Sequence, residues 1–227
     1  MQTRRFLWLK RSIAILQKDL RMEFRTRYAY STLVMFAVTV LVAVSFSVGG
    51  MMLEYDLAAA LLWVILFFSA MAGLSRTFVQ EEESGTVVAL KMAADPEPVY
   101  LGKLMFNTVL LFSLALLIVP LFLVMLNLSV AMPLSFVKVV ALGCLGLSGA
   151  STILAAIVAK AAVKGALLTV LALPVLLPLL IGAINATRST LAGVPAEVLR
   201  PDLGLLLFYN AMAVTASLLL FEYVWNE

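Results

Sequence analysis

Six long stretches without a charged residue limit what this chain can fold into. About 20 residues at a rise of about 1.5 Å each cross the roughly 30 Å hydrocarbon core of a bilayer, and each stretch is close to that length or longer. We therefore predict an all-α integral membrane protein with six transmembrane helices. The stretches are Tyr28–Leu53, Leu57–Ser75, Leu104–Val137, Val139–Ala159, Gly165–Thr187 and Leu203–Phe221.

Little of the chain is expected outside the bilayer. Only 13% of its residues are charged, against about 25% in soluble domains. The third stretch is too short for two spans, so we expect one span that ends near Leu126 and a loop over Asn127–Ser135. Small residues such as Gly143 and Gly146 predict close helix packing in the fourth span. A short surface helix is expected at Ala196–Leu199, between the last two spans.

The distribution of basic residues predicts the orientation. With six spans both termini lie on one side, and thirteen of the sixteen Lys and Arg residues fall on that side. Basic loops stay in the cytoplasm. We therefore expect a multi-pass protein of the bacterial inner (cytoplasmic) membrane with both termini cytoplasmic.

Residues 1–27 form a basic segment with an apolar stripe. Residues spaced three or four apart share one face of a helix, which predicts an amphipathic helix lying in the interface of an anionic leaflet. The alternative is a merely basic tail. We expect this helix to precede a permease domain over residues 28–227. The stripe consists of Phe6, Leu9, Ile13, Leu16, Leu20 and Phe24.

The longest polar interruption covers residues 76–103. Three consecutive carboxylates cannot lie in lipid, so we expect this segment in water, on the cytoplasmic side. Gly85 loosens the chain, and Pro96 and Pro98 are expected to stop any helix. Between these breakers a short helix is predicted at Thr86–Ala94. The carboxylates are those of Glu81, Glu82 and Glu83.

This short helix is a candidate docking element for a partner. Val87, Leu90 and Ala94 share one of its faces, which we expect to be presented to that partner. The acidic run is expected to pair with basic residues of the partner or to stabilise the start of the helix through its dipole. The alternative is a solvated loop that only keeps the spans in register.

The sequence lacks the residues of several chemistries. It has no phosphate-binding loop of the G-x-x-x-x-G-K-[ST] type, no histidine and one cysteine, Cys144. ATP hydrolysis by this chain, a metal centre and a nucleophile–base pair are therefore not expected. The spans contain no Asp, Glu, Lys, Arg or His except at their ends, which argues against an ion-coupled carrier. The chain is typical of the membrane half of a machine whose motor is another subunit.

The segment Leu61–Asn107 resembles the cytochrome c maturation permease family, also called haem exporter protein B (CcmB). An aromatic-rich second span leads into an F-x-x-[DE] acidic run, followed by a glycine, a leucine-containing helix, a proline-containing turn and a lysine that opens the third span. The chain length and the six spans are also similar. The matching residues are Phe78, Glu81, Glu82, Glu83, Gly85, Leu90, Pro96 or Pro98, and Lys103.

The resemblance implies a membrane subunit of an ATP-binding-cassette complex. Its expected partners are a cytoplasmic ATPase chain, a haem-handling membrane subunit and membrane lipids, with no nucleic acid. The complex would export haem or use ATP to release a haem-loaded chaperone. No cofactor is expected in this chain, because it lacks the usual axial ligand of haem. The alternatives are an exporter subunit for a drug, lipid or polysaccharide, and a non-transporting scaffold.

Overall fold

The computed structural model describes residues 2–50, 52–74, 76–159 and 164–226. This part of the chain contains nine helices and no strand. In chain order they are α1 (Gln2–Thr26), α2 (Tyr28–Val48), α3 (Tyr55–Leu74), α4 (Arg76–Glu83), α5 (Val87–Ala93), α6 (Pro96–Met125), α7 (Pro133–Val158), α8 (Lys164–Ala192) and α9 (Ala196–Asn226).

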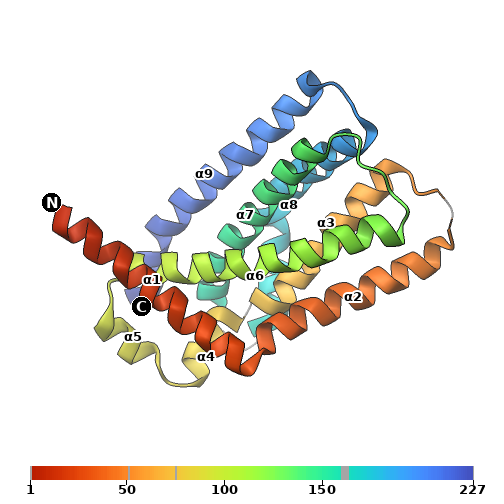
Figure 1. Ribbon diagram of the computed structural model, residues 1–227. Coiled ribbons are helices and arrows are strands. Elements are labelled where there is room, and N and C mark those ends of the chain that lie inside the picture. The colour runs from red at the N-terminus through yellow and green to blue at the C-terminus, as the bar shows by residue number, and fades with distance from the viewer. Residues whose placement is uncertain (1, 51, 75, 160–163, 227) are drawn as a thin grey trace.

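Six of the helices are long and apolar enough to cross a membrane: α2, α3, α6, α7, α8 and α9. The predicted all-α fold with six spans is therefore confirmed. The start of α1 and the end of α9 lie at one end of the bundle, together with α4 and α5 (Figure 1). The α2–α3, α6–α7 and α8–α9 connections lie at the other end (Figure 1).

The centre of the bundle is formed by α3 and α7, which are the most buried of the spans. Trp63 of α3 is fully buried, and its indole nitrogen donates to the hydroxyl of Thr187 on α8 at 2.8 Å. A methyl group at Gly143 of α7 would lie 1.9 Å from the Trp63 ring. Only glycine therefore leaves room for this ring, and the predicted packing through small residues is confirmed.

Three predicted boundaries were wrong, each at a proline or near one. The expected loop over Asn127–Ser135 is shorter, because α7 already begins at Pro133. The short helix at Ala196–Leu199 is the first turn of α9, which continues through Pro201. Pro96 and Pro98 do not form a turn; they lie in the first turn of α6. The first N–H groups of a helix have no partner within the helix, so a proline at this place costs no hydrogen bond.

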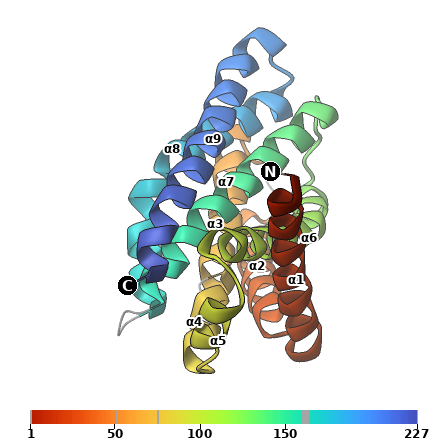
Figure 2. The ribbon, with the colours of Figure 1, turned by 90° about the vertical axis from the view of Figure 1, so that its left-hand side faces the viewer.

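Helix α1 lies against the start of α6 (Figure 2). Its buried face consists of Ser12, Ile15 and Asp19. The predicted apolar stripe points elsewhere: Leu9, Ile13 and Phe24 are exposed, and Leu16 and Leu20 are half-buried. The side chain of Phe6 lies outside the described residues. An outward apolar stripe is what a helix in the membrane interface requires.

The contact of α1 with α6 depends on Gly102. A methyl group there would lie 2.7 Å from Cβ of Ile15 and 2.9 Å from the carbonyl oxygen of Ser12. Because the second neighbour is backbone, we expect Gly102→Ala to push α1 away from α6 and to lower the free energy of unfolding by about 1–3 kcal/mol. Thermal unfolding of the purified chain and proteolysis of α1 measure this.

The matched control is Gly149→Ala in α7. Gly149 is buried, but nothing lies within 4 Å of the methyl group that alanine would add. We expect this variant to be as stable as the wild type or slightly more stable, because alanine favours a helix by about 1 kcal/mol over glycine. Equal stability of the two variants would contradict the proposed role of Gly102.

Candidate functional site

The segment 76–103 folds into α4, α5 and the first turns of α6. The chain reverses after α4 at Gly85, whose φ of +67° favours glycine. The backbone N–H of Thr86 then donates to the carbonyl oxygen of Glu81 at 3.0 Å. The helix predicted at Thr86–Ala94 is present as α5, with Thr86 and Ala94 as its caps.

Four charged side chains meet where this segment contacts α1. Lys103 of α6 lies with its Nζ 2.8 Å from Oε1 of Glu81 on α4 and 3.0 Å from Oδ2 of Asp19 on α1. Lys18 Nζ lies 3.2 Å from Oδ1 of Asp19 and also binds Glu81. We call Lys18, Asp19, Glu81 and Lys103 the charge cluster. It joins α1, α4 and α6, and its charges balance.

The charge cluster is buried. The exposed fraction is 3% for Asp19, 4% for Glu81 and 1% for Lys103, while Lys18 reaches the surface. Burial lowers the pKa of Lys18, but the hydrogen bond to Glu81 and the charges of Asp19 and Glu81 outweigh burial and raise the pKa above its usual value. Lys18 therefore stays protonated, and each carboxylate keeps a cation beside it.

Glu81 also fixes the start of α5. The hydroxyl of Thr86, the N-cap residue of α5, donates to Oε2 of Glu81 at 2.5 Å. Lys103 Nζ donates in addition to the carbonyl oxygen of Thr77 on α4, at 3.1 Å. One buried carboxylate and one buried ammonium group thus connect both short helices to the first turns of a span.

The expectation that the whole acidic run lies in water was wrong for Glu81. Its carboxylate is paired within the chain, not kept free for a partner. Glu82 is half-buried, and Glu83 is exposed with Oε2 3.3 Å from Nη2 of Arg76. Only these last two carboxylates remain at the surface.

Aromatic side chains join α4 to the last span. Phe78 of α4 packs against Phe221 and Trp225 of α9, with ring centroids 5.6 and 6.5 Å apart. Tyr100 of α6 reaches the same Phe221 ring at 5.2 Å. Lys91 of α5 has its Nζ 5.6 Å from the centroid of the Trp225 ring. The end of α9 therefore contacts α4, α5 and α6 together.

The face of α5 that we expected to be presented to a partner lies against this chain instead. Val87 and Leu90 are half-buried and pack on the core, and Ala94 is buried. The outward face carries Val88 and Met92, which are 68% and 85% exposed. The predicted face was therefore wrong. The exposed apolar surface of α5 is shifted by one residue along the helix and consists of Val88 and Met92.

The family model of the CcmB protein matches residues 10–223 of this chain. The chain belongs to the CcmB family. Membership implies a permease component of the haem exporter for cytochrome c maturation, which is a multi-subunit complex. Permeases of this family are generally non-catalytic. No curated protein matches the chain.

The residues that resemble the CcmB family do not all gather at one place. Phe78, Glu81 and Lys103 lie inside, in the aromatic contacts and the charge cluster. Gly85 forms the exposed reversal before α5. Glu82 and Glu83 follow the surface of α4, and the two prolines begin α6.

Sequence reasoning missed Lys18 and Asp19. They appeared only as parts of a basic helix, because nothing in the sequence indicates that α1 crosses α6. One signal was available: Asp19 follows Ser12 and Ile15 at helical spacing, on a face beside the apolar stripe and not on it. An acidic residue on that second face of a basic helix indicates a buried partner.

A ladder of polar side chains leads from the charge cluster into the bundle. The hydroxyl of Thr77 donates to Oδ1 of Asn107 at 2.6 Å, and Nδ2 of Asn107 donates to the hydroxyl of Thr152 at 2.8 Å. The hydroxyls of Thr108 and Ser148 lie 2.9 Å apart. Such bonds hold spans together in lipid, so α4, α6 and α7 form one connected unit.

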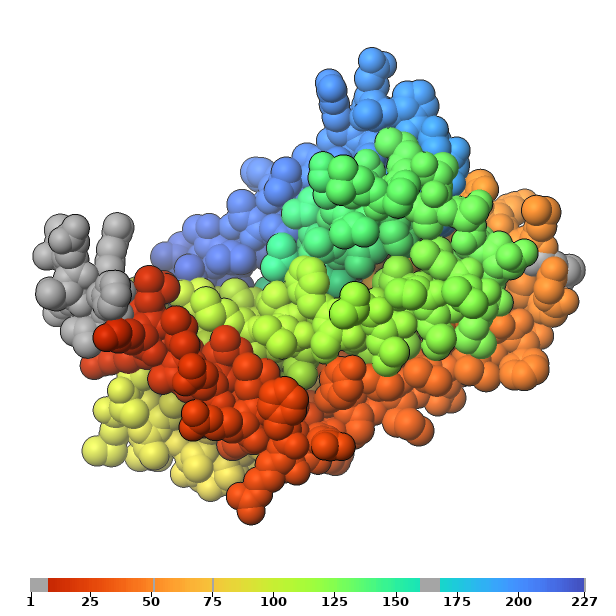
Figure 3. Space-filling model, in the orientation of Figure 1, coloured from red at the N-terminus to blue at the C-terminus, as the bar shows by residue number. Residues whose placement is uncertain are grey.

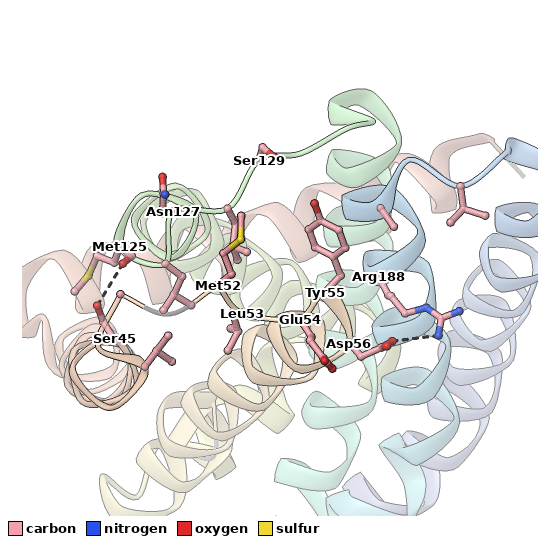
Figure 4. A pocket seen from close by; sticks show the side chains of 16 residues that line it. Ser45, Met52, Leu53, Glu54, Tyr55, Asp56, Met125, Asn127, Ser129 and Arg188 are labelled. Carbon is pink, nitrogen blue, oxygen red and sulfur yellow. Dashed lines mark hydrogen bonds and ion pairs between the residues drawn. The ribbon is translucent and has the colours of Figure 1, made fainter.

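The opposite end of the bundle contains a cavity of about 830 Å³. It lies between the α2–α3 connection, the α6–α7 connection and α8 (Figure 4). Arg188 Nη1 lies 3.1 Å from Oδ1 of Asp56, and the hydroxyl of Ser45 donates to the carbonyl oxygen of Met125 at 3.4 Å. Within the described residues no group of His, Cys, Asp and Glu could hold a metal ion.

Proposed function

We propose that this chain is the membrane-spanning permease subunit of an ATP-binding-cassette complex in cytochrome c maturation. Residues 28–227 form the permease domain, residues 1–27 an interfacial helix, and residues 76–103 a cytoplasmic coupling segment. The protein lies in the bacterial inner membrane with both termini in the cytoplasm. ATP is hydrolysed on a partner chain, and the complex exports haem or releases a haem-loaded chaperone.

The observation that carries this proposal is the placement of α5. The helix exposes Val88 and Met92, while its inner face and its N-cap are held by buried contacts. Exposed apolar side chains on a short water-facing helix are typical of a surface that docks a partner. Membership in the CcmB family supports an ATPase as that partner.

The contacts of the coupling segment suggest how movement is transmitted. A displacement of α5 acts on Glu81 through Thr86, and Glu81 is bonded to Lys103 at the start of α6. The same displacement acts on Trp225 at the end of α9 through Lys91. Two spans therefore receive the motion directly. A scaffold that only holds subunits together has no need of these connections.

We propose that this chain holds no cofactor. Haem would bind to the haem-handling membrane subunit or the chaperone, and ATP to the ATPase. The absence of histidine from the sequence supports this division of labour, because histidine is a common axial ligand of haem.

Site-specific cross-linking tests the docking of α5. Cys144 is the only cysteine and is fully buried, so Cys144→Ala gives a background for single cysteines. In the assembled complex we expect Val88→Cys to cross-link to the ATPase. The matched control is Leu90→Cys, two positions away on the inner face, which should react far less. A reversed pattern, or no product from either variant, contradicts the proposal.

A further inference from the structure

A groove opens where α1, α2 and α6 meet, with a volume of about 480 Å³. Figure 3 shows these three helices converging on one face of the molecule. Leu20 and Phe24 of α1 and Val109 and Leu110 of α6 give the groove an apolar lining. Phe24 and Val109 are exposed, by 76% and 44%. The groove therefore presents unburied apolar surface.

One cation and one anion also line the groove: Arg27, at the corner between α1 and α2, and Glu23, one turn before it. The corner exists because Arg27 adopts the left-handed conformation (φ 53°, ψ 18°). Glu23 Oε1 accepts the backbone N–H of Tyr30 at 2.8 Å, in the first turn of α2. This bond satisfies one of the N–H groups that a helix start leaves without a partner.

Neither charge is neutralised by the described part of the chain. No ion pair there includes Arg27 or Glu23. The groove thus combines a guanidinium group, a carboxylate and an apolar surface. A ligand that fits has a phosphate to pair with the guanidinium group, an ammonium group to pair with the carboxylate and a hydrocarbon chain to cover the apolar surface.

We propose that the groove binds phosphatidylethanolamine, with the phosphodiester at Arg27, the primary ammonium at Glu23 and an acyl chain along Leu110. The location suits a lipid, because the uncharged span α2 begins at Tyr28 and α6 has no charge after Lys103. The groove therefore extends from the headgroup level into the hydrocarbon region.

A transmembrane helix of a partner fits the groove less well. The part of α6 that lines the groove, Val109–Ser113, rises by about 6 Å at about 1.5 Å per residue. A spanning helix would require a seat nearer 30 Å long. Among lipids, phosphatidylglycerol has no cation for Glu23, and the choline group of phosphatidylcholine has no N–H to donate.

Lipid retention by the purified full chain tests the proposal. Phosphatidylethanolamine, phosphatidylcholine and phosphatidylglycerol with the same acyl chains are added in detergent, and bound lipid is counted by native mass spectrometry. We expect phosphatidylethanolamine to be retained about fivefold over phosphatidylcholine, because only the ethanolamine ammonium can donate a hydrogen bond to Glu23. Arg27→Gln should lower the retention of phosphatidylethanolamine and of phosphatidylcholine about fivefold each, because the phosphodiester of both lipids loses the charge that attracts it.

Glu23→Gln keeps an oxygen for the Tyr30 N–H but removes the carboxylate that accepts a charge-assisted hydrogen bond from the ethanolamine ammonium. It should therefore lower the retention of phosphatidylethanolamine to that of phosphatidylcholine. The matched control is Arg25→Gln, because Arg25 is exposed and does not line the groove; it should change nothing. A variant is included in the comparison only if its unfolding midpoint, measured without added lipid, equals that of the wild type.

Two results overturn the proposal. One is a wild type that retains phosphatidylglycerol better than phosphatidylethanolamine, which indicates simple attraction to basic residues. The other comes from Ser113→Trp, which fills the groove and should abolish lipid retention. If this variant keeps its lipid but loses a partner subunit on purification, the groove seats a partner helix.

Discussion

Replacing Lys103 with methionine is expected to lower the free energy of unfolding by about 3–5 kcal/mol, the usual cost of breaking a buried ion pair on one side. Lys103 is 1% exposed and contacts both Asp19 and Glu81. Without it, two buried carboxylates share Lys18 alone. Chemical unfolding of the purified chain and its yield in membranes measure the loss.

Two further variants show whether charge balance is the cause. Arg76→Met removes the cation of an exposed pair with Glu83, and we expect a change of about 1 kcal/mol or less. Asp19→Asn added to Lys103→Met leaves one cation and one anion in the cluster, so it should restore part of the lost stability. A Lys103→Met variant as stable as Arg76→Met would contradict the role of the cluster.

Most of the fold could be predicted from the sequence, because lipid allows few solutions. A charge in the hydrocarbon core is costly and every backbone group must be satisfied internally. The uncharged stretches therefore correspond to spans, as in α3 and α7. The small residues of α7 predicted close packing, and the ring of Trp63 against Gly143 agrees with that prediction.

The interior of the candidate site could not be predicted in the same way. The contact of Lys18 with Glu81 joins residues 63 positions apart, and it exists only because α1 lies across α6. Three adjacent glutamates look equivalent in the sequence, yet α4 turns Glu81 inward and leaves Glu83 exposed. Which of the three is buried depends on how α4 packs against α1 and α6, and the run of three glutamates does not by itself show it.

Local rules failed where two of them applied at once. Pro96 and Pro98 end a helix by one rule and begin a helix by another, and the structure follows the second. The face of α5 failed for a related reason, since Val87 and Leu90 share a face equally well whether it points outward or inward. Only the packing of α5 on the core decides that the outward residues are Val88 and Met92.

Placing a charge on the outward face of α5 is expected to separate the ATPase from the complex. Met92 is 85% exposed in this chain, so Met92→Asp should leave its own fold intact. If Met92 is covered by the ATPase, the new carboxylate is buried without a partner, at a cost of about 2–3 kcal/mol. That cost corresponds to roughly 100-fold weaker association, measured by co-purification of the ATPase and by ATP hydrolysis in the complex.

The matched control is Met52→Asp, which places the same charge at a fully exposed methionine of the α2–α3 connection, at the other end of the bundle. This variant should assemble and hydrolyse ATP as the wild type does. Leu90→Asp is a poorer test, because Leu90 packs on the core of this chain and its loss would destabilise the subunit itself. If Met92→Asp changes neither association nor ATP hydrolysis, α5 does not dock the motor, and the segment 76–103 only keeps the spans in register.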